Sequence, residues 1–134
     1  MKEILEILNK QVGNYVIVGS LALYLQGMIE DFNGKDIDII VDKDEDYFSD
    51  NPYWKPQHNR FSDKRGWVTQ LNNTWIEVFN NPFPEYDEFD VDGVTVKVIT
   101  IKEIKEHYKN LDINKIGGHQ NFQNKLRAYI EMSS

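Results

Sequence analysis

The chain has 134 residues and a formal net charge of −7, and hydrophobic residues make up 40% of it. This length is enough for one domain with a buried core but not for two, so we expect residues 1–134 to form a single domain. An acidic chain is a poor general binder of nucleic acid, because phosphate neutralisation supplies most of the non-specific affinity. Cysteine is absent, which excludes disulfides and thiolate metal sites and is consistent with a cytoplasmic location.

The sequence contains no membrane-spanning or targeting pattern. No apolar run approaches the roughly 20 residues that span a bilayer. The first residues carry an acid early and no long apolar run, so we expect no signal peptide. Charge is unevenly distributed, because residues 51–80 hold four bases against two acids whereas residues 81–96 hold five acids and no base. The basic strip over residues 55–65 is either a solvated loop or a contact for a phosphate tail or an RNA end.

Apolar periodicity predicts helices and strands in alternation. In chain order we expect a helix over 2–12, a strand over 15–18, a helix over 21–26, a strand over 37–41, a short helix over 44–48, strands over 67–71, 74–80 and 94–99, and helices over 101–109 and 121–132. This order predicts an α/β (α+β) fold, with a mixed β-sheet flanked by helices.

Turn and cap residues mark the boundaries of these elements. Ser20 is placed to cap the helix over 21–26, and Thr100 to cap the helix over 101–109. Asn72-Asn73 is typical of a hairpin turn. We expect two longer irregular segments, over residues 50–66 and in the acidic stretch from Pro82 to Gly93.

Two short segments carry the chemistry. Gly19-Ser20 follows an apolar strand and precedes a helix, which is a place to hold phosphate. Asp36 and Asp38 open the next strand, and residues i and i+2 of a strand share a face. Two carboxylates on one face repel each other unless a cation sits between them, and Mg²⁺ is the natural cation for such oxygen ligands.

A third acid is expected from a later strand. Metal-assisted transfer to a hydroxyl uses two cations about 3.5–4 Å apart that share carboxylates. Glu77 is the one acid inside the apolar run 74–80, and a charge there is costly unless it is paired or metal-bound. Alternatively, Glu77 faces solvent at a strand edge, and an acid from residues 87–92 is used. Trp54 and Trp67 could stack a base, although a flank of the core is the simpler interpretation.

These segments together resemble the nucleotidyltransferase superfamily, the fold of DNA polymerase β and the bacterial minimal nucleotidyltransferases. Its pattern is an apolar strand, Gly-[Gly/Ser], a helix, then Asp-x-[Asp/Glu] on the next strand and a third acid later. The resemblance implies a magnesium-dependent enzyme that moves an NMP group from an NTP such as ATP to an acceptor hydroxyl on a small molecule, an RNA end or a protein. It implies that Gly19 and Ser20 contact the triphosphate, that Asp36 and Asp38 bind two Mg²⁺ ions, and that Glu77 completes the metal site.

The sequence departs from the family pattern in the linker before the paired acids. Fifteen residues separate Ser20 from Asp36, more than is usual in the family. Many small members have an Arg just before the paired acids, whereas this chain has Lys35 there. Lys35 could contact phosphate, though not in the bidentate way of an Arg. The large helical domain of bigger members is also missing. A catalytically degenerate binding or regulatory protein, such as an antitoxin-like partner, is therefore the alternative, and a homodimer or a helical partner protein could complete the cleft.

Overall fold

The computed structural model describes residues 1–30, 32, 35–43, 46–59 and 65–109. The expected turn at Asn33-Gly34 and the helix expected over 121–132 lie outside the described residues. The elements are α1 (Lys2–Gln11), β1 (Val16–Val18), α2 (Gly19–Leu25), β2 (Asp36–Val41), α3 (Asp46–Ser49), β3 (Lys55–Gln57), β4 (Gly66–Leu71), β5 (Thr74–Asn80), β6 (Tyr86–Val91), β7 (Val94–Ile99) and α4 (Ile101–Lys109).

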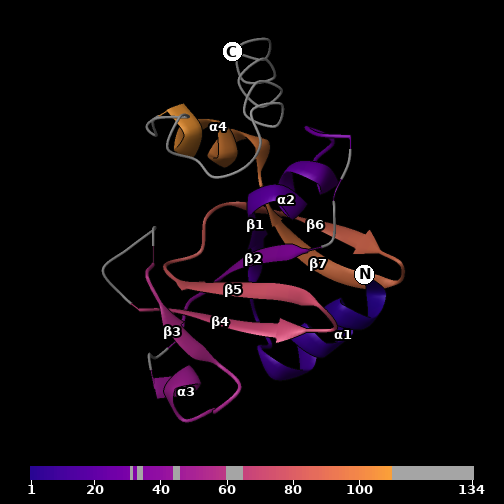
Figure 1. The fold of residues 1–134 in the computed structure, drawn as a ribbon. Helices are drawn as coiled ribbons and strands as arrows, with labels where there is room; N and C mark the ends of the chain where they lie inside the picture. The colour runs from indigo at the N-terminus through magenta and orange to yellow at the C-terminus, as the bar shows by residue number, and fades with distance from the viewer. Residues whose placement is uncertain (31, 33–34, 44–45, 60–64, 110–134) are drawn as a thin grey trace.

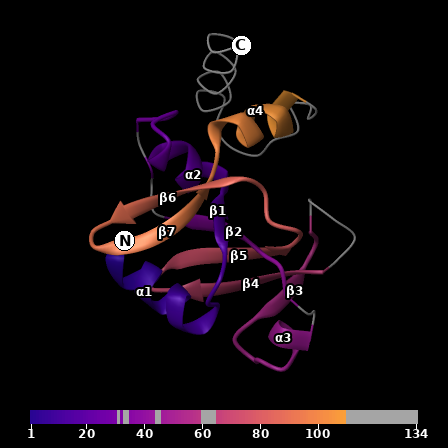
Figure 2. The same ribbon diagram turned by 180° about the vertical axis from the view of Figure 1, so that it is seen from behind.

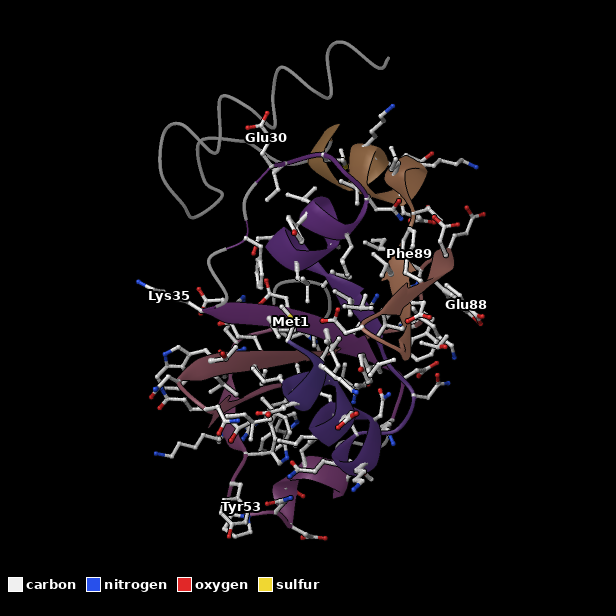
Figure 3. All side chains as sticks on the ribbon, turned by 90° about the vertical axis from the view of Figure 1, so that its right-hand side faces the viewer. Met1, Glu30, Lys35, Tyr53, Glu88 and Phe89 are labelled. Atoms are coloured by element: carbon white, nitrogen blue, oxygen red, sulfur yellow. The ribbon has the colours of Figure 1, made fainter. Side chains whose placement is uncertain are left out.

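The strands form one mixed sheet in the order β3-β4-β5-β2-β1-β7-β6. Two neighbouring pairs are parallel, β2 with β5 and β1 with β7, and the other pairs are antiparallel. Figures 1 and 3 both place α2 and α4 on one side of the strands and α1 on the other. The predicted fold class, a mixed sheet flanked by helices, is confirmed.

The core lies on both sides of the central strands, between them and the helices α1 and α2. Leu5 and Leu8 of α1 are fully buried, and all three residues of β1 are buried. The helix lies near β7, as the view from behind shows (Figure 2). The hydroxyl of Tyr15, which follows α1, donates to Asn9 Oδ1 at 2.7 Å. Among the described residues, none of the helices has the length and apolar character needed to cross a bilayer.

Several of the expected turns and caps are confirmed. Asn72 and Asn73 have φ values of 48° and 66°, the left-handed conformations that a tight hairpin turn requires. Thr100 Oγ1 accepts a hydrogen bond from the backbone N–H of Glu103 at 3.2 Å, which caps α4. Gly27, just after α2, has a φ of 75°, the left-handed conformation that is typical of a glycine at the end of a helix.

Two strands were not expected, and both lie at edges of the sheet. The acidic stretch contains β6, whose Tyr86 pairs with Ile99 of β7. The segment over 50–66 contains β3, which includes Pro56. An edge strand has a partner on one side only, so it tolerates a proline and needs no buried face. The loop interpretation of both segments is therefore wrong in part, because it relied on apolar alternation.

A fully buried asparagine ties the ends of β2 and β5 together. Asn80 Nδ2 donates to Lys43 O at 2.6 Å, and Asn80 Oδ1 accepts from Lys43 N at 3.3 Å. The carbonyl of Asn80 accepts from Asn59 Nδ2 at 2.9 Å. These bonds fix the chain where it leaves β2, at the end opposite the paired acids.

Replacing this side chain should lower stability. We expect Asn80→Ala to reduce the free energy of unfolding by about 1–3 kcal/mol, because two hydrogen bonds from the buried Asn80 side chain to the part-buried backbone of Lys43 are lost. Urea unfolding measures the loss. Asn81→Ala is the matched control, because the side chain of Asn81 makes an exposed hydrogen bond to Pro82 O, and we expect a change within about 0.5 kcal/mol. Equal effects of the two variants would contradict the role given to Asn80.

Candidate active site

The register of β2 and β5 brings the expected acids together on one sheet face. Asp38 is the partner of Glu77 across this parallel pair, and Asp36 is the partner of Trp75. Laterally paired residues point to the same face and lie about 5 Å apart. The residues between them, Ile37 and Ile76, are fully buried on the other face. Asp36, Asp38 and Glu77 therefore form a row of acids, here called the acid face.

A glycine packs directly against this acid face. Val18 is the antiparallel partner of Asp38, so the chain turns into α2 beside that carboxylate. Gly19 has a φ of 68°, and a Cβ built on it would lie 2.3 Å from Asp38 Oδ2. Only glycine satisfies both the left-handed backbone and the close approach. Gly19 and Asp38, separate in the sequence, are therefore neighbours in the fold.

The cap expected from Ser20 is wrong. The helix α2 begins at Gly19, and Val18 takes the N-cap position, so Ser20 lies within the first turn. The reason is the positive φ of Gly19, which turns the chain one residue earlier than a serine cap would. The backbone N–H groups of Gly19 and Ser20 belong to the first turn of α2, where amides have no earlier helical carbonyl as acceptor.

The acids differ in their access to solvent. Asp36 is exposed, whereas Asp38 and Glu77 are half-buried, and Oδ1 of Asp38 is shielded from solvent. Lys35 is exposed and projects from the body of the protein (Figure 3). Its carbonyl accepts a hydrogen bond from the backbone N–H of Trp75 at 2.7 Å, which extends the pairing of β2 and β5 beyond Asp36.

The acid face has the ligand chemistry for a hard cation. Carboxylate oxygens are the ligands that Mg²⁺ prefers, and the absence of a side chain at Gly19 lets the chain pass close to Asp38. The side chains do not form a closed cage. In the part of the chain that the structure describes, no group of three or more His, Cys, Asp or Glu side chains is placed to hold a metal ion. Asp36, Asp38 and Glu77 offer oxygen ligands of the kind that magnesium takes, on one face of the sheet, but in this structure they are not arranged as a metal site.

The rival third acids lie elsewhere. Asp87, Glu88 and Asp90 belong to β6, which β1 and β7 separate from β2. Figure 3 shows Glu88 on the side of the molecule opposite Lys35. The sheet order therefore favours Glu77 as the third acid. Of the basic strip, Lys55 and Arg65 are described and exposed, and residues 60–64 lie outside the described residues.

Trp54 and Trp67 are part of the core, as the simpler of their two interpretations predicts. Trp54 and Trp67 are each 5% exposed. Their rings pack around Phe48, with centroids 5.1 and 6.1 Å from its ring centroid. Trp75 is 47% exposed and pairs with Asp36. Sequence reasoning missed Trp75, although its position two residues before Glu77 places both on one face.

The mixed sheet flanked by helices is also found in a solved protein structure. No family model matches the sequence, and no curated protein matches it significantly. The structure is similar to a crystal structure from Thermotoga maritima that carries the provisional name of a nucleotidyltransferase, with a TM-score of 0.58 and 20% identity. The match covers 98% of this chain and 94% of the other. At this identity the likeness shows the fold alone.

Proposed function

We propose that the protein is a magnesium-dependent nucleotidyltransferase, which moves an NMP group from an NTP to an acceptor hydroxyl. One observation carries the proposal. The register places Asp36, Asp38 and Glu77 on one face, and Gly19 packs against Asp38 at the start of α2. The likeness to a provisionally named nucleotidyltransferase supports it.

Each residue has a role in this proposal. Asp36 and Asp38 would hold the two Mg²⁺ ions, and Glu77 would complete the site on the acceptor side. Bound magnesium supplies Lewis-acid stabilisation of the attacking and leaving oxygens. The amides of Gly19 and Ser20 donate to phosphate oxygens, and Lys35 offsets phosphate charge. The acceptor oxygen bonds to the α-phosphorus, the bond to the β-phosphate oxygen breaks, and pyrophosphate leaves. A carboxylate of the acid face takes the proton of the hydroxyl.

Binding of nucleotide should raise the melting temperature only with magnesium. A ligand at 100 times its Kd adds about 2.7 kcal/mol to the stability of the protein, which is a shift of several degrees for a domain of this size. We expect one or more of the four NTPs to give this shift with Mg²⁺ and to lose it in EDTA. A melting screen with each NTP measures it, and a pyrophosphate assay measures turnover.

The melting screen has its own controls, and each contrary outcome has a different meaning. Mg²⁺ alone and each NTP alone show whether the two ligands depend on each other. If no NTP stabilises the protein with magnesium, the proposal is wrong. If nucleotide binds but no pyrophosphate is released with any acceptor offered, the protein is a binding or regulatory member of the fold, and a copurifying helical partner would be its expected companion.

A further inference from the structure

One aromatic side chain beside the acid face is left open to solvent. Trp75 is 47% exposed, whereas Trp54 and Trp67 are each 5% exposed. Aromatic rings are among the largest sources of burial energy, so an indole that lies half open at a sheet face leaves a binding surface uncovered. Its neighbours in the strand, Thr74 and Ile76, are buried, which fixes the backbone that carries it.

Trp75 belongs to the acid face by register. It pairs with Asp36 on one side and with Gln70 of β4 on the other. Glu77 lies two residues along the same strand and therefore shares the face. The backbone N–H of Trp75 donates to Lys35 O at 2.7 Å. Trp75 thus stands in the row next to the proposed metal ligands, with its Cα about 5 Å from the Cα of Asp36.

The position of Trp75 relative to Gly19 indicates which end of a substrate it meets. The glycine turn follows β1, and β2 lies between β1 and β5. The phosphate-binding turn and Trp75 are therefore on opposite sides of the paired acids. A group stacked on Trp75 reaches the acids from the side away from the triphosphate, which is the side of the acceptor. Lys55 occupies the row of Glu77 at the sheet edge, across Val68, and offers a cation to an acceptor phosphate.

We propose that Trp75 is a stacking platform for a nucleobase of the substrate, which rests on the proposed function. Every nucleobase presents a π-face, and stacking on an aromatic side chain is sequence-tolerant. The geometry favours a base of the acceptor, at the end of a short single strand. The base of the NTP is the second source of the same chemistry. Trp75 contacts substrate but takes no part in bond making.

Binding measured without turnover tests this inference. Isothermal titration calorimetry with Mg²⁺ would use three probes: an NTP analogue whose α,β bridge is a non-hydrolysable methylene, a single-stranded RNA trinucleotide and inorganic tripolyphosphate. We expect Trp75→Leu, which keeps apolar bulk but removes the π-face, to weaken binding of a base-containing probe by roughly 10-fold or more. Trp75→Phe should restore most of the affinity. Tripolyphosphate, which has no base, should bind both variants like the native chain.

A remote aromatic provides the matched control. Tyr53 is 77% exposed and projects from another side of the molecule (Figure 3), so Tyr53→Leu should leave all three affinities unchanged. Loss for the trinucleotide assigns the platform to the acceptor base, and loss for the NTP assigns it to the donor base. Unchanged affinity for both overturns the inference. Base binding that depends on Trp75 without any pyrophosphate release would instead reject the proposed function and leave the platform standing.

Discussion

Asn in place of Asp38 should abolish nucleotidyl transfer and leave the fold intact. Asp38 lies at the centre of the candidate site, because it pairs with Glu77 on one side and packs against Gly19 on the other. Asparagine has the same shape but lacks the negative charge that holds a divalent cation. Metal stabilisation of the transition state amounts to several kcal/mol, so we expect the rate to fall roughly 1,000-fold or more. Pyrophosphate release under saturating NTP measures the rate.

The control variant lies at the other end of the same strand. Asp42 follows Val41 and is exposed, so Asp42→Asn changes net charge equally without touching the acid face. We expect its transfer rate and melting temperature to match those of the native chain. Asp38→Asn should also melt within a few degrees of the native chain, because the replacement is isosteric. Undiminished transfer by Asp38→Asn would contradict the proposed role of the acid face.

The local segments of the site were predictable from sequence, but the third acid was not fixed. Gly19-Ser20 and Asp36-x-Asp38 each lie at the boundary of an apolar strand, and strand periodicity settles which side chains share a face. Lateral neighbours are another matter. The strand β5 lies next to β2 although α3, β3 and β4 intervene in the chain. The acids of β6 are as suitable as metal ligands by residue type as Glu77 is, so composition cannot exclude them. Only the sheet order does, because it places β6 away from β2.

The remaining errors share a physical cause. Apolar alternation detects strands with a buried face, and β6 and β3 have little such burial, with patterns that are mostly exposed. The tryptophans show the same limit of sequence spacing, although the interpretation of Trp54 and Trp67 as a flank of the core is confirmed. Trp54 sits in a loop-like segment yet is buried against Phe48, whereas Trp75 sits in an apolar strand yet is exposed. Burial of a large ring depends on what covers the sheet, and sequence spacing does not show that.

We expect Gly19→Ala to destabilise the fold strongly, although it adds only one methyl group. The added Cβ would lie 2.3 Å from Asp38 Oδ2 and 3.0 Å from its Cγ, on a residue with a φ of 68°. Backbone strain costs about 1–3 kcal/mol, and overpacking adds about 1–3 kcal/mol. We therefore expect Gly19→Ala to lower the free energy of unfolding by about 2–6 kcal/mol, measured by urea denaturation.

Gly27 separates backbone strain from overpacking, because it shares the positive φ of Gly19 but has no close neighbour. Its φ is 75°, and a Cβ there would meet nothing within 4 Å, so Gly27→Ala should cost about 1 kcal/mol. Removing the carboxylate of Asp38, which the added methyl group would clash with, tests the contact itself. In a double-mutant cycle, Asp38→Ala should recover about 1 kcal/mol or more of the loss in Gly19→Ala. Strict additivity would contradict the contact. Because the methyl group displaces Asp38, Gly19→Ala should also lose magnesium-dependent NTP binding, whereas Gly27→Ala should keep it.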